Sequence, residues 1–215
     1  MRRLIGRHVA GAWSADRPTA CTSHLIRRSC LISVSETTLN ATGLPVGDWS
    51  LDPTHSSASF AVKHMGVATF RGRFEKFDAT FIVNDDSAEL RGSVDAGSIV
   101  VKDENLQAHL GSPDFFDIER YPEIEFRSTF LSRQGDELIV DGELTIKGHT
   151  HAVEGRGTIE GPGTTLRGAV NLGITLQTIV DRTEFGLNFN APLPSGGVAV
   201  ANDVKLTIEL ELIRG

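Results

Sequence analysis

From Trp49 to the C-terminus, apolar and polar residues alternate along the chain with a period of two. Apolar residues occupy every second position, and charged or hydroxyl-bearing residues occupy most positions between them. Alternation of this kind is typical of antiparallel strands with one buried face and one face in water. The clearest segments are 56–64, 70–74, 77–83, 90–96, 124–130, 138–146 and 204–212.

The alternation changes phase at Lys76, where a series ending at Phe74 gives way to one beginning at Phe77. A slip of this kind is what a β-bulge produces. One short helix is expected at 103–110, and it leads into a long loop at 112–123. Turn-forming residues separate the other segments at Asn84-Asp-Asp-Ser, Gln134-Gly-Asp, Gly161-Pro-Gly and Pro194-Ser-Gly-Gly.

About eight strands with a single helix predict an all-β fold, and a closed antiparallel barrel fits them better than βαβ units. A two-sheet sandwich would explain the same alternation, but the buried series are long and mix glycine with phenylalanine. An eight-stranded barrel has an interior that side chains fill or that holds one small ligand. The sequence is compatible with a filled interior and with a ligand-binding one, so a structural module with a solid core is an alternative to a binding protein.

Composition and charge exclude some classes of function. The 215 residues are 40% hydrophobic and 23% charged, which is ordinary for a globular protein, and no stretch approaches the ~18 consecutive apolar residues of a membrane-spanning helix. Residues 1–33 contain six arginines and one acidic residue, a net charge of +5, which leaves −12 on the rest of a chain whose total is −7. An acidic body repels phosphate backbones, so no nucleic-acid partner is expected.

The basic N-terminal segment is not expected to belong to the fold. Residues 1–45 are interpreted as a disordered or mis-called basic leader, with an organelle transit peptide as the second interpretation, and residues 46–215 as the barrel domain. Both cysteines, Cys21 and Cys30, lie in this leader, so the barrel has neither a disulfide nor a thiolate nucleophile. The leader has no continuous apolar region of a secretory signal, so a cytoplasmic location is expected, with the periplasm as the alternative.

Several motifs resemble the YceI-like family of lipocalin-like bacterial proteins. The matching segments are 49–65 and 67–77, 112–117 (SPDFFD), 121–126 (YPEIEF), 144–150 (LTIKGHT) and 181–187 (DRTEFGL), in family order within 46–213. The resemblance implies an extended eight-stranded barrel that binds a polyisoprenoid or similar long-chain amphiphile. It also implies a non-enzymatic role in isoprenoid-quinone metabolism, transport or storage, with no cofactor. Transient membrane contact during ligand exchange and a homodimer are further expected partners.

A polyprenyl chain offers only hydrocarbon surface, so its site needs apolar area and shape more than hydrogen-bond donors. Phenylalanine-rich walls suit this requirement, because aromatic rings give large and rigid contact surfaces. The paired phenylalanines of the 112–123 loop are interpreted either as a lid on the barrel or as simple packing. The predicted ligand contacts are Phe60, Val62, Phe70, Phe74, Phe81, Val94, Leu106, Phe115, Phe116, Phe126, Phe130, Leu144, Ile174 and Leu176.

The sequence gives weaker support to a metal-binding or catalytic function. His149 and His151 lie two residues apart, which on a strand places both imidazoles on one face, and they carry the alternative of a metal-binding barrel or metal-dependent hydrolase. His55, with His64 or His109, would have to supply further ligands, and nothing in the sequence brings them close, so no metal site and no catalytic residue are predicted. Asp181-Arg-Thr-Glu is interpreted as a corner held by an arginine–carboxylate pair in preference to an anion site.

Overall fold

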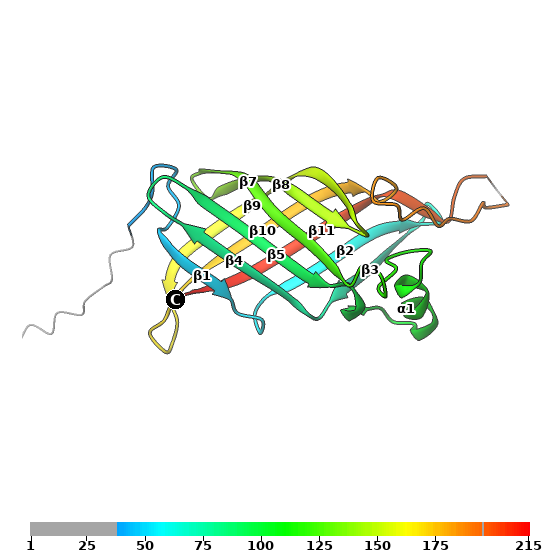
Figure 1. The fold of residues 1–215 in the computed structure, drawn as a ribbon, viewed down its shortest axis with the longest axis horizontal. Coiled ribbons are helices and arrows are strands. Elements are labelled where there is room, and N and C mark those ends of the chain that lie inside the picture. Colours follow the sequence, from blue (N-terminus) through cyan, green and yellow to red (C-terminus); the bar gives the residue numbers. More distant parts are fainter. Residues whose placement is uncertain (1–37, 195) are drawn as a thin grey trace, which may run out of the picture. The chain divides into compact units, whose positions relative to one another are not determined.

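The computed structural model describes residues 38–194 and 196–215. Most of the predicted leader, residues 1–37, lies outside the described residues. The described chain contains one α-helix and the strands of a single antiparallel sheet (Figure 1). These elements are β1 (Gly47–Leu51), β2 (Ser57–His64), β3 (Ala68–Phe74), β4 (Phe77–Val83), β5 (Ala88–Asp95), β6 (Ile99–Val100), α1 (Glu104–Gly111), β7 (Glu123–Gln134), β8 (Glu137–Ile146), β9 (His149–Thr164), β10 (Val170–Asp181) and β11 (Val200–Arg214).

Eight of the strands close into a barrel in the order β1-β4-β5-β7-β8-β9-β10-β11, and the pairing of β1 with β11 completes the ring. β2, β3 and β6 extend this wall, because β2 continues along β11 from the point where β1 ends. The all-β eight-stranded barrel predicted from the sequence is therefore confirmed, and the strands form no separate sandwich layers. None of the helices among the described residues has the length and apolar character required to span a membrane.

The phase slip predicted at Lys76 separates β3 from β4. β3 pairs with β2 and β6, whereas β4 pairs with β1 and β5, so the chain changes its neighbours in the sheet at this point. Backbone hydrogen bonds connect the chain to its neighbours on both sides of the change. The Glu75 amide donates to the Ser98 carbonyl at 3.1 Å, and the Asp95 amide donates to the Lys76 carbonyl at 3.0 Å. Phe74 and Phe77 consequently both keep their side chains toward the interior although they are an odd number of residues apart.

Two boundaries differ from the sequence prediction. Residues 161–163, expected as a turn, lie inside the long strand β9, and the chain reverses instead at 165–168, where Gly168 adopts a positive φ of 84°. The barrel unit also begins before residue 46. Leu44 is fully buried in the core, and the Asn40 side chain accepts the Leu44 amide at 2.9 Å, so residues 38–45 belong to the barrel.

Candidate binding cavity in the barrel

The interior of the barrel consists of two side-chain clusters with a cavity between them. The closed-end core contains Leu44, Trp49, Ala79, Phe81, Val83, Leu90, Leu131, Leu138, Val140, Ile159, Leu172, Ile174, Leu176, Leu210 and Leu212. The lid-end core contains Ile99, Leu110, Phe115, Leu144, Ile146, Val180, Phe185 and Leu187. Phe126 packs against both clusters and marks the level of the cavity. The volume open to the centre of a water-sized sphere is about 160 Å³.

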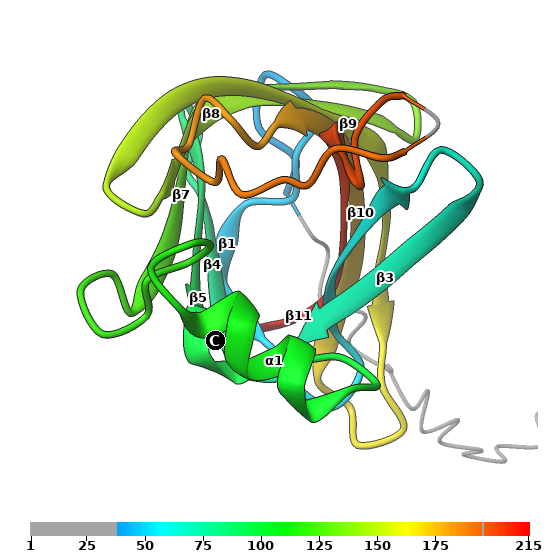
Figure 2. The same ribbon diagram turned by 90° about the vertical axis from the view of Figure 1, so that its right-hand side faces the viewer.

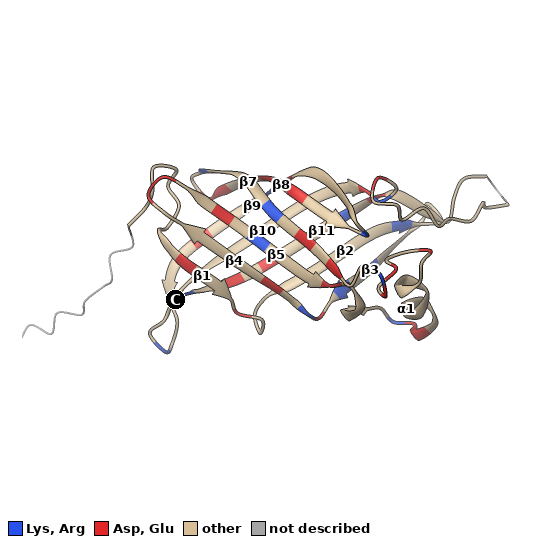
Figure 3. Ribbon diagram, in the orientation of Figure 1, with Lys and Arg blue, Asp and Glu red and all other residues tan. Residues whose placement is uncertain are grey.

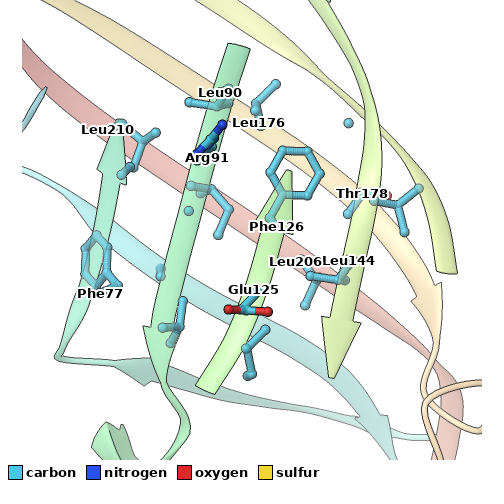
Figure 4. Close-up of a pocket in the computed structure, with 18 of the residues that line it drawn as sticks. Phe77, Leu90, Arg91, Glu125, Phe126, Leu144, Leu176, Thr178, Leu206 and Leu210 are labelled. Atoms are coloured by element: carbon cyan, nitrogen blue, oxygen red, sulfur yellow. The ribbon is translucent and has the colours of Figure 1, made fainter. Parts of the chain in front are cut away.

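The cavity wall is almost wholly apolar (Figure 4). Strand alternation explains this, because every second residue of the surrounding strands points inward and is aliphatic or aromatic. Arg91 and Glu125 border the cavity at intervening positions, and both are exposed to solvent. The chief lining side chains are Ala58, Phe74, Phe77, Ala79, Leu90, Val94, Ile124, Phe126, Val140, Leu144, Ile146, Val153, Leu176, Leu206, Ile208 and Leu210.

Two glycines on the inner face have different surroundings, and one of them, Gly92, borders the cavity. Gly92 lies between the inward residues Leu90 and Val94, and a Cβ placed on it would meet only the Asp78 carbonyl oxygen, at 3.7 Å. Gly142 has the opposite surroundings, because its Cβ would lie 2.5 Å from the ring of Phe126. The aromatic ring therefore lies over a glycine of the neighbouring strand, and the space beside Gly92 belongs to the cavity.

Five of the predicted contacts line the cavity: Phe74, Val94, Phe126, Leu144 and Leu176. Phe81 and Ile174 face inward as expected but lie in the closed-end core, where they are 0% and 1% exposed. Phe60, Leu106, Phe115 and Phe116 pack in the lid-end core. Val62 is buried, and Phe70 is half-buried on the neighbouring strand, with its ring centroid 6.1 Å from that of Phe60.

The expectation that Phe130 faces the interior is wrong, because its side chain is 56% exposed. The register between β7 and β8 shifts between Ser128 and Phe130, which is a β-bulge. The bulge moves Leu131 inward in place of Phe130. Ser128 is itself buried, and its hydroxyl accepts the Leu90 amide at 2.8 Å, which satisfies a backbone donor at the irregular point of the sheet.

Residues 103–122, here called the lid, lie at the end of the barrel shown in Figure 2. Asp103 begins α1 as its N-cap, accepting the Leu106 amide at 2.8 Å, and the helix buries Leu110. Phe116 packs edge-to-face against Phe74, with ring centroids 5.9 Å apart, and Phe74 lines the cavity. Phe116 therefore packs directly behind a residue of the cavity wall, whereas Phe115 is buried against His109 and Phe189.

The histidines of the sequence do not assemble into one site in the described part of the chain. His149 is exposed beside Gly186, and His151 packs against the ring of Phe185 with Nε2 3.0 Å from the Glu184 carbonyl oxygen. His109 belongs to the lid, where it lies 3.3 Å from a carboxylate oxygen of Asp114.

Among the described residues, one group of three side chains has the spacing of metal ligands: Asp52, His55 and Glu211. It lies on the outside of the barrel. The Nδ1 atom of His55 is 2.9 Å from Asp52 and 3.6 Å from Glu211. The hydrogen bond to Asp52 raises the pKa of His55, and the same contact lowers the pKa of Asp52. Neither His149 nor His151 belongs to this group.

The Asp181–Glu184 corner is held differently from the predicted arginine–carboxylate pair. Arg182 is 5% exposed and donates to the backbone carbonyl oxygens of Ala201, Val200 and Leu187. Asp181 instead accepts the amide and the hydroxyl of Thr183. The guanidinium therefore joins the end of β10 to the start of β11, and burial lowers its pKa.

The chain matches the YceI-like domain over residues 49–212. It belongs to the YceI-like family. A UPF0312 protein of Staphylococcus aureus (strain USA300) is 33% identical over 171 residues, which cover 76% of this chain and 96% of the relative.

Solved structures resemble the fold of this YceI-like protein. The crystal structure of Burkholderia cenocepacia BcnA has a TM-score of 0.65 and 22% identity, and the match covers 75% of this chain and 98% of BcnA. A polyisoprenoid-binding domain from Saccharophagus degradans, described as implicated in plant cell wall breakdown, has a TM-score of 0.60 and 13% identity over 78% of this chain and 98% of that domain. At these identities the likeness concerns the fold.

Proposed function

We propose that this YceI-like protein is a non-enzymatic binding protein that holds a polyisoprenoid or similar long-chain amphiphile inside the barrel. The apolar cavity between the two cores carries the proposal. A hydrocarbon chain needs no polar partner along its length, and each buried methylene contributes ~0.8 kcal/mol. The polyisoprenoid-binding description of the Saccharophagus domain supports the same ligand class. The proposed role lies in isoprenoid-quinone metabolism, transport or storage.

The size of the cavity limits how much of such a ligand fits before side chains have to move. An apolar cavity of about 150 Å³ accommodates a molecule the size of benzene, so the 160 Å³ here holds only a short stretch of chain. A longer chain has to displace side chains of the lid-end core, among them Phe60, Phe74 and Phe116. These rings exchange contacts with one another for contacts with hydrocarbon, so the displacement exposes little apolar surface to water.

Lipid extraction and native mass spectrometry of protein purified from a bacterial host test the proposal. We expect a co-purified lipid of several hundred daltons, or uptake of an added polyprenyl compound. Gly92→Leu places a side chain in the cavity, and its Cβ would be in ordinary van der Waals contact with the Asp78 carbonyl oxygen at 3.7 Å, so it is expected to lower ligand occupancy at least severalfold while the barrel still folds.

Gly173→Leu is the matched control for Gly92→Leu. Gly173 lies on β10 at a position between the inward residues Leu172 and Ile174, and no atom lies within 4 Å of a Cβ placed there. The same leucine on the outer face is expected to leave occupancy unchanged. Protein that carries no lipid and takes up no polyprenyl compound would contradict the proposed function, and so would equal occupancy in both variants.

A further inference from the structure

Two loops at the lid end of the barrel carry exposed apolar side chains. The β2–β3 hairpin loop exposes Met65 by 49% and Val67 by 86%, and the segment before β11 exposes Val198 by 49%. The two loops are joined, because the Met65 amide donates to the Ala199 carbonyl at 2.7 Å. Figures 1 and 2 show both loops at the same end of the barrel as α1. These three residues are here called the apolar tip.

The charged residues nearest to the apolar tip in sequence are two cations, Lys63 and Arg71, and one exposed acidic residue, Asp203. The stretch 185–202 contains no charged residue, although the whole chain has a net charge of −7. The hairpin loop is bounded by the cations Lys63 and Arg71, both exposed. Acidic side chains lie along the barrel wall and on the lid, whereas the projecting loop before β11 is free of them (Figure 3). Exposed apolar residues with cations beside them are the combination that binds an anionic membrane interface.

Aromatic residues connect the hairpin that carries the tip with the cavity. Phe70 on β3 lies 6.1 Å from Phe60, measured between ring centroids, and Phe60 lies 5.9 Å from Phe74. Phe74 lines the cavity. A hydrocarbon chain that leaves the cavity along these rings stays on apolar surface until it reaches the strands of the tip.

We propose that the apolar tip inserts into the interface of an anionic lipid bilayer, and that the ligand passes between bilayer and cavity at this point. The inference rests on the proposed function for its purpose, while the docking itself rests on the tip. Three loop side chains are too few for a stable protein–protein interface, which buries on the order of 800 Å² per partner. A peripheral membrane contact needs only a few inserted side chains and cations at the headgroup level.

Vesicle sedimentation tests the docking with the full chain. Phosphatidylcholine vesicles with and without phosphatidylglycerol serve as probes, and binding is expected to be stronger with phosphatidylglycerol and to weaken with salt. The double variant Met65→Asn and Val67→Ser removes apolar side chains, and asparagine tolerates the positive φ of 51° at residue 65. We expect its partition onto anionic vesicles to fall roughly tenfold.

Leu166→Ser is the matched control for the tip variant. Leu166 is fully exposed beside the cation Arg167, but it lies in the β9–β10 turn. That turn lies at the opposite end of the barrel from the tip loops (Figure 1). Its loss is expected to leave vesicle binding unchanged.

Three results would overturn the docking proposal: no vesicle binding by the wild type, equal binding by the tip variant, or a dimer that the tip variant dissociates. The last would assign the tip to a second copy of the chain. Ligand occupancy, measured in parallel by native mass spectrometry, separates this proposal from the proposed function. A tip variant that loses vesicle binding but retains its lipid supports both. Tip-dependent vesicle binding by a protein that never carries lipid supports docking alone.

Discussion

The pair formed by Asp52 and His55 shows how one local contact sets the charge state of an exposed side chain. His55 lies three residues after Asp52 in the turn between β1 and β2, and the Asp52 carboxylate also accepts the Thr54 amide at 2.8 Å. Glu211 of β11 adds a second carboxylate 3.6 Å from the imidazole. Two negative neighbours favour the imidazolium form, so the pKa of His55 is raised.

A titration of the His55 ring by NMR checks this assignment. The pKa is expected above the ordinary histidine value in the wild type and closer to that value in Asp52→Asn. Because the folded-state pKa is raised, the contact stabilises the fold fully below the unfolded pKa of histidine. This contribution disappears as the pH rises through the folded pKa. Glu209→Gln removes a carboxylate from the same strand with no ion pair to His55, so a shift as large as that of Asp52→Asn would contradict the assignment.

At the scale of the strand, a glycine decides whether an aromatic ring fits the inner wall. A Cβ on Gly142 of β8 would lie 2.5 Å from the Phe126 ring and 2.7 Å from the backbone oxygen of Arg127. Gly142→Ala must therefore push Phe126 toward the cavity and strain the β7–β8 ladder. We expect a loss of about 1–3 kcal/mol in the free energy of unfolding.

Chemical denaturation measures this loss. Gly173→Ala on β10 provides the comparison, because nothing lies within 4 Å of its Cβ and its φ is not positive. A surface change of this kind is expected to alter the free energy of unfolding by no more than ~0.5 kcal/mol. Equal effects of the two substitutions would show that steric crowding at residue 142 is not the cause.

The strands that could be predicted from the sequence are those in which apolar and polar residues alternate without interruption. β8 and β11 alternate without interruption, and the core residues predicted on them, such as Leu138 and Leu212, are fully buried. β1 is short and is defined by its pairing with β11, which is remote in sequence, so alternation alone could not delimit it. β9 is rich in glycine and charge, and its inner positions include Gly155 and Gly157 in place of large apolar residues.

The sequence predicted which residues face the interior of the barrel, but not how far each of them lies from its ends. Alternation correctly placed Phe81 and Phe126 on the inner side, yet it contains no signal for the distance of a residue from either end of the barrel. Phe81 therefore proved to belong to the closed-end core. The outward turn of Phe130 depends on the register between β7 and β8, a property of the pair of strands. The polar Ser128, buried within an apolar series, was the one residue type there that could have indicated a bulge.

At the scale of the whole barrel, the closure of the ring depends on both ends of the described chain. β1 pairs with the last residues of β11, so that Trp49 is opposite Arg214 and Leu51 is opposite Leu212. Trp49 is 1% exposed, and its indole Nε1 donates to the Pro45 carbonyl at 3.1 Å. The closed ring leaves β4 and β11 without a free edge at this end, which removes the aggregation hazard of an open sheet.

Two N-terminal deletions separate the barrel from the segment before it. Removal of residues 1–37 is expected to leave the melting temperature, ligand occupancy and response to reductant unchanged, because the ring and both cores are formed by later residues and both cysteines are removed. Removal of residues 1–51 deletes β1, Leu44 and Trp49, so it opens the ring between β4 and β11 and exposes the closed-end core to water. That variant is expected not to fold cooperatively. Thermal denaturation followed by circular dichroism measures the melting temperature of both variants.

If the removal of residues 1–37 lowered the melting temperature by many degrees at physiological salt, the arginine-rich segment would be stabilising the acidic barrel. In that case the loss should shrink as added salt screens the attraction.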